Sequence, residues 1–187
     1  MSTITTTTVR PALRPLGWTT VVGGLGIVTA GIVAAVDANI ADSAWFGFAG
    51  ASALLATAGV VGLRRATAAV PLSQKVLGAA AVTMTLFALA HFYAVADQDR
   101  AIPFFSAFMM LSALGLIIAG IAILRARLWS GPARVLPLIT GLWPLTIPIG
   151  LALGDVPHFV AIALWGACWT ALGRLLLHLS DRPDSVA

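Results

Sequence analysis

A chain of 187 residues that is 59% hydrophobic and only 10% charged cannot cover itself with a water-soluble surface, because soluble domains carry about a quarter charged residues. The net charge of +4 does not indicate a nucleic-acid partner, since the basic residues lie in short segments between apolar runs. One cysteine, Cys168, excludes an intramolecular disulfide. Much of the surface must face lipid. The absence of Glu and the excess of Arg over Lys are typical of a GC-rich, bacterial genome.

Six apolar runs are long enough to cross a bilayer, which needs about 20 apolar residues in helical form. They cover residues 16–36, 44–63, 76–96, 102–124, 135–153 and 156–177. Each run is predicted to be a helix, because lipid offers no partners for free backbone groups. The first run exceeds the apolar core of a signal peptide, so we interpret it as a retained span.

The sequence therefore predicts an all-α integral membrane protein with one six-helix transmembrane domain over residues 16–179. Residues 1–15 are predicted to form a disordered tail, and residues 180–187 a second tail. Basic residues occupy both ends of the chain and the second and fourth loops, whereas acidic residues occupy the first, third and fifth loops. The positive-inside rule then places both termini in the cytoplasm and the chain in the plasma or inner membrane.

A repeating layout is visible in the outer loops, where Asp37, Asp97 and Asp155 recur at similar intervals. The pattern predicts three helical hairpins of similar length, either through duplication or because any six-helix bundle with short loops shows it. The layout resembles HdeD-type acid-resistance membrane proteins, which are also built from short hairpin repeats. This resemblance rests on glycine spacing and hairpin count, without a family motif.

Small residues four apart let helices approach closely in lipid. Three such pairs are Ala58 with Gly62, Gly115 with Ala119, and Gly150 with Gly154. They predict close packing within the bundle, or a seam for a homo-oligomer or another membrane protein. The lipid bilayer is the other partner that the sequence predicts.

The fifth run contains Pro137, Pro144 and Pro148. Proline removes a helical hydrogen bond and displaces the carbonyl four residues earlier, so this helix should be kinked. Freed carbonyls inside a membrane must face protein or a cavity, and interrupted helices often border transporter sites. The alternative is a kink that serves packing only. The candidate pocket residues are Thr140, Trp143, Pro144, Thr146, Pro148, Trp165 and Trp169.

Two histidines, His91 and His158, fall in the same outer half of the membrane, on the side of Asp97 and Asp155. Imidazole and carboxylate ligands suit a transition metal, two histidines suit a b-type haem, and histidine also suits a pH sensor. A histidine bonded to a backbone carbonyl is the plain alternative for His91. For His158 the plain alternative is a helix start formed by Asp155 and Pro157. No cofactor is predicted as the default.

No Asp, Glu or Lys lies in the middle of an apolar run, and no nucleotide-binding or hydrolase motif is present. The sequence thus favours a non-catalytic envelope protein with a structural, stress-response or assembly role. The first alternative is a small-solute transporter or channel component with a site beside the fifth helix. The second is a metal- or haem-binding redox protein or enzyme that uses His91 and His158.

Overall fold

The computed structural model describes residues 12–37 and 43–181. Within these ranges the chain is helical without strands, and six helical segments are long and apolar enough to cross a membrane. Five are the helices α1 (Leu13–Val36), α2 (Ser43–Ala66), α3 (Pro71–Ala94), α4 (Gln98–Ala126) and α7 (Asp155–Asp181). The remaining span, Ala133–Leu153, is built from shorter pieces. The prediction of a helical, multi-pass membrane protein is confirmed, whereas most of the two predicted tails lies outside the described residues.

Five helices begin earlier than their apolar runs predict, α1 at Leu13 within the predicted tail, and the differences are largest at α3 and α4. Helix α3 begins at Pro71, where a missing N–H costs nothing in the first turn. Helix α4 begins at Gln98, because the carboxylate of Asp97 accepts a hydrogen bond from the backbone N–H of Arg100 at 3.1 Å. Both first turns are polar, so hydropathy alone does not include them, although their capping chemistry favours a helix.

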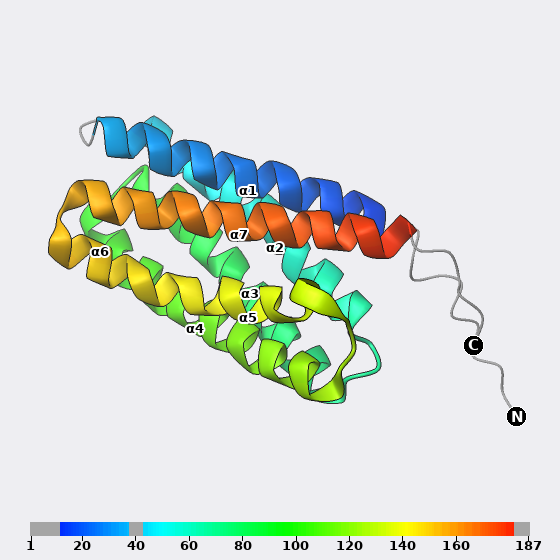
Figure 1. Cartoon of the computed structure of the whole chain (residues 1–187). Helices are drawn as coiled ribbons and strands as arrows, with labels where there is room; N and C mark the ends of the chain where they lie inside the picture. The colour runs from blue at the N-terminus through cyan, green and yellow to red at the C-terminus, as the bar shows by residue number, and fades with distance from the viewer. Residues whose placement is uncertain (1–11, 38–42, 182–187) are drawn as a thin grey trace, which may run out of the picture.

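The helices form a closed bundle in which α1 packs along α7 (Figure 1). The other packed pairs are α1 with α2, α2 with α3, α3 with α4, α4 with α5, and α6 with α7. The start of α1 and the end of α7 lie at one end of the bundle. The cytoplasmic placement of that end, and the grouping into three hairpins, remain predictions.

Glycines allow the close approach of α1 and α7. Gly24 in α1 faces Gly166 in α7, and a Cβ atom added at Gly24 would lie 2.5 Å from the backbone nitrogen of Thr170. Gly17 of α1 and Gly173 of α7 face each other in the same way, about two helical turns away along the same interface. The backbones therefore contact each other directly, which is the dispersion-driven packing expected in lipid. This seam between the first and last helices was not predicted.

The predicted small-residue pairs are also used inside the bundle. Gly62 lies against the side chain of Leu176, and Gly115 lies against Ala80. Gly150 approaches the backbone of His158, whereas Gly154 has φ of 119° and forms the turn between α6 and α7. The pair of Gly150 and Gly154 therefore does not form one packing face, because its second member is a turn residue.

The fifth span is interrupted where its prolines predict. It consists of η3 (Gly131–Val135), α5 (Leu136–Leu142), η4 (Trp143–Thr146) and α6 (Ile147–Leu153). Pro144 lies in the first turn of η4 and Pro148 in the first turn of α6. Helix α5 packs against α4, whereas α6 packs against α7 and not closely against α4. The interruption thus separates α6 from α4 in one half of the bundle.

Candidate ligand cavity

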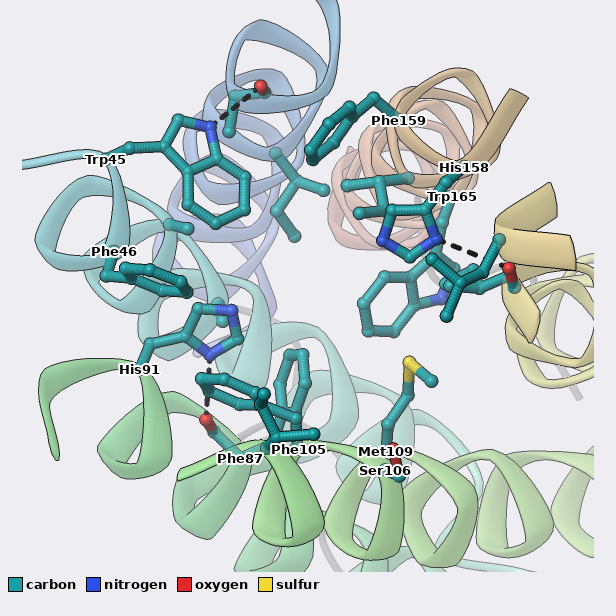
Figure 2. Close-up of a pocket in the computed structure, with 18 of the residues that line it drawn as sticks. Trp45, Phe46, Phe87, His91, Phe105, Ser106, Met109, His158, Phe159 and Trp165 are labelled. Atoms are coloured by element: carbon teal, nitrogen blue, oxygen red, sulfur yellow. Dashed lines mark hydrogen bonds between the residues drawn. The ribbon is translucent and has the colours of Figure 1, made fainter. Parts of the chain in front are cut away.

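A cavity of about 450 Å³ lies between α1, α2, α3, α4, α6 and α7 (Figure 2). Its volume falls within the range of small-molecule sites in proteins. Most of its wall is apolar, and among residues 12–37 and 43–181 no Asp, Glu, Lys or Arg side chain lines it. The aromatic lining residues are Trp45, Phe46, Phe87, Phe105, Phe159 and Trp165.

The aromatic side chains hold one another in place. The rings of Phe46 and Phe105 are stacked, with centroids 6.0 Å apart and planes 4° from parallel. The rings of Phe87 and Trp165 meet edge to face at 5.8 Å. Such pairs stabilise the wall beyond the area that they bury. The wall therefore has a defined shape that suits flat, apolar groups.

His91 enters the cavity from the last turns of α3 and is almost fully buried. Its Nδ1 atom lies 3.0 Å from the carbonyl oxygen of Phe87. A carbonyl only accepts, so in the neutral imidazole this nitrogen carries the hydrogen and Nε2 keeps a free lone pair. The ring lies against Phe87 and Phe105, with centroids 4.6 and 4.5 Å away. Gly50 of α2 packs against its Cβ, which fixes the base of the side chain.

His158 enters from the first turns of α7, on the opposite side of the cavity (Figure 2). Its Nδ1 atom lies 3.4 Å from the carbonyl oxygen of Ile147 in α6, a longer contact than that of His91. Its Nε2 atom is also directed into the cavity. Gly150 lets α6 approach the backbone of His158 and so positions this histidine beside α6.

The carboxylates of Asp97 and Asp155 do not form a site with the two histidines. Asp97 and Asp155 are not in the cavity wall. Asp97 instead caps α4 and forms an ion pair with Arg100, with Oδ2 and Nε 3.2 Å apart. Asp155 is exposed in the first turn of α7. Among residues 12–37 and 43–181, no group of three or more His, Cys, Asp or Glu side chains comes together in a metal-binding arrangement.

The candidate pocket predicted beside the fifth helix meets this cavity only in part. Pro148 and Trp165 line it. Trp143 instead donates its indole N–H to the carbonyl of Ala161 at 2.8 Å, and the hydroxyl of Thr146 donates to the carbonyl of Trp143. Thr140, Pro144 and Trp169 are buried in the packing beside the cavity. The structure therefore brings two predicted pocket residues and both histidines into one site.

The cavity opens between α4 and α6. Several lining residues on these helices are exposed, including Ile102 at 51% and Leu151 at 59%. Gln98 and Ser106 of α4 and Pro148 of α6 are also exposed lining residues. The opening lies in the same half of the bundle as the end of α3 and the start of α7.

Most of the aromatic wall was not predicted from the sequence. Phe46, Phe87, Phe105 and Phe159 lie on four different helices, and each looks like an ordinary apolar residue of its own span. The available signal was their similar depth, since each lies near an end of its helix on the side of the outer loops. No family model matches the sequence, and comparisons with curated proteins and with solved structures found no match.

Proposed function

We propose that this chain is a non-catalytic membrane protein that takes part in small-solute transport, with the cavity as the binding site for one lipophilic molecule. The observation that carries the proposal is the 450 Å³ apolar cavity inside the bundle. Its volume is that of small-molecule sites in proteins, and its wall is mainly aromatic and aliphatic. Exposed lining residues on α4 and α6 leave a route by which an apolar molecule enters it.

The interrupted fifth span supports a transport role. Ile147, Pro148 and Leu151 of α6 form one wall of the cavity and one side of its opening. The short turn η4 separates this wall from α5, which stays packed on α4. Broken helices beside a central site are a recurring feature of transporters. In this proposal α6 moves about η4 and opens or closes the passage next to α4.

A redox or metal protein is the second candidate, because both histidines line the same cavity. The side chains around the cavity fit a haem less well. A haem brings two propionates, which need cationic or hydrogen-bonding partners, and the part of the lining that the structure describes holds no basic side chain. The ultraviolet–visible spectrum of the purified protein separates the two candidates. The transport proposal predicts no Soret band, and a Soret band that is lost in His91→Ala would favour the redox candidate.

A structural or stress-response role, which the sequence favoured, needs no internal site. Binding of an apolar probe distinguishes it from the transport proposal. The probe is 1,4-dimethoxy-2-tert-butylbenzene, titrated by calorimetry into the protein in lipid nanodiscs, with empty nanodiscs as the blank. Ala49 lies in the cavity wall, so Ala49→Leu fills part of the space. Ala107 is exposed on α4 outside the cavity, so Ala107→Leu is the matched control.

The proposal predicts saturable binding of one probe molecule that Ala49→Leu abolishes and Ala107→Leu leaves intact. Probe uptake that equals the blank, or that is the same in both variants, would show that the cavity is not a binding site. In that case the structural role becomes the better interpretation.

A further inference from the structure

We infer that the cavity selects neutral ring compounds that carry a hydrogen-bond donor at each end, of which a hydroquinone is the simplest class. The inference rests on the proposed function, because it names the chemistry of the molecule that the cavity binds. The feature that carries it is the pairing of two histidine acceptors, His91 and His158, on opposite walls of one cavity (Figure 2).

Backbone carbonyls favour the same tautomer in both histidines. Nδ1 of His91 is next to the carbonyl of Phe87, and Nδ1 of His158 is next to the carbonyl of Ile147. Each carbonyl accepts a hydrogen bond and so selects the tautomer with hydrogen on Nδ1. Each Nε2 is then a bare acceptor that faces the cavity. The site therefore offers a lone pair from either side.

The indole N–H groups in the wall already donate hydrogen bonds to backbone carbonyls. The indole N–H of Trp45 donates to the carbonyl of Ala30 at 3.0 Å. The indole N–H of Trp165 donates to the carbonyl of Thr140 at 3.3 Å. Gln98 and Ser106 also carry donors, but they lie on the exposed side, at the opening. Among the described residues, the wall around the two histidines thus presents acceptors, so a ligand that bonds to them must supply the donors.

The body of the ligand should be uncharged and flat. The described part of the lining contains no charged side chain that would compensate an ionic group. The stacked pair of Phe46 and Phe105 and the edge-to-face pair of Phe87 and Trp165 surround the space with aromatic surface. A flat ring with hydroxyl groups at opposite ends matches the aromatic walls in shape and the two acceptors in hydrogen-bonding chemistry.

Three probes that share one tert-butyl-substituted ring test this inference in nanodiscs by calorimetry. They are tert-butylhydroquinone with two donors, its dimethyl ether with none, and tert-butylbenzoquinone with acceptors only. We expect the diol to bind at least tenfold more tightly than either other probe. His91→Phe and His158→Phe keep a ring but lose the acceptor, and each should reduce the preference for the diol over the ether. His178→Phe makes the same replacement at an exposed position of α7 outside the cavity, and should retain the preference.

Wild-type protein with ¹⁵N-labelled histidine gives a measurement that needs no variant. Before addition of the diol, the ¹⁵N shifts should show hydrogen on Nδ1 at two of the three histidines, and the diol should shift both Nε2 signals. Equal affinity for diol and ether, with loss of both in Ala49→Leu, would overturn the donor requirement while the proposed binding function stands. Tighter binding of the quinone, or hydrogen on Nε2 of His91, would also overturn it. Absence of binding by all three probes would overturn the proposed function as well.

Discussion

The indole nitrogen of Trp165 donates a hydrogen bond to the carbonyl oxygen of Thr140 across 3.3 Å. Pro144, four residues after Thr140, has no N–H, so the normal helical donor to this carbonyl is missing. Inside a membrane the carbonyl would otherwise lack a partner. A tryptophan on α7 thus repairs the defect that a proline creates in the fifth span, and the same tryptophan lines the cavity.

This relationship predicts that two similar substitutions lower the free energy of unfolding by different amounts. Trp165→Phe removes the side-chain donor to the Thr140 carbonyl, whereas Trp169→Phe removes a buried indole N–H that has no partner among the described residues. Both changes remove a similar volume from α7. We expect Trp165→Phe to destabilise the protein by about 1–3 kcal/mol more than Trp169→Phe, the cost of an unsatisfied buried polar group. Reversible unfolding in mixed micelles measures the difference, and equal losses would contradict the repair.

The glycine seam predicts that α1 and α7 do not tolerate a methyl group between them. A Cβ atom at Gly24 would meet the backbone nitrogen of Thr170 at 2.5 Å, so the two helices must separate. Gly24→Ala should lower the free energy of unfolding by about 1–3 kcal/mol, as overpacking does. Gly47 of α2 has open space around it, so Gly47→Ala should be neutral or slightly stabilising. The free energy of unfolding of both variants tests this prediction. Equal values for Gly24→Ala and Gly47→Ala would refute it.

The passage between α4 and α6 predicts a change of distance when the cavity is filled. Nitroxide labels on Ser106→Cys and Leu151→Cys, in a Cys168→Ser background, report this distance by pulsed electron resonance. Addition of tert-butylhydroquinone should shorten it, because α6 closes on α4. Labels at Leu25 and Leu164, exposed on the glycine-packed helices, should not respond. Saturable binding without any change at the first pair would leave the cavity as a binding site but remove the moving wall.

The charge pattern predicts the orientation of the bundle. Arg64 and Arg65 end α2, and Arg125 ends α4, close to the end of the bundle that holds the start of α1. The positive-inside rule makes this end cytoplasmic. A reporter fused after residue 187 should therefore behave as cytoplasmic, and one inserted after residue 97 as external. External activity of the first fusion would remove the predicted orientation.

The spans were predictable because their apolar runs are continuous and as long as a bilayer is thick. The interruption at Pro144 and Pro148 was predictable because proline acts locally. The shared depth of His91 and His158 was predictable too, since depth follows from counting residues from the loops. The absence of Asp97 from their site follows from its capping of α4, which the Asp-Gln-Asp-Arg segment signals only once the helix start is known.

The cavity itself was not predictable in the same way. Its wall combines residues of six helices, and their meeting depends on which helices are neighbours. That order depends on contacts such as Gly24 with Gly166, which join the first and last helices of the chain. Glycines seven residues apart occur in both helices, but nothing local pairs them. The order of the helices around the bundle, rather than the local sequence, decides that Trp45 and Phe159 line the same cavity.

The most direct measurement of the central claim is native mass spectrometry of the protein extracted from membranes in a lipid-retaining polymer. We expect the mass of the wild-type peak to exceed that of the chain by one small, neutral molecule. The same molecule should be absent from Ala49→Leu, where the cavity is partly filled, and present in Ala107→Leu. A wild-type peak without such a molecule, or one that persists unchanged in Ala49→Leu, would contradict the assignment of the cavity as a ligand site.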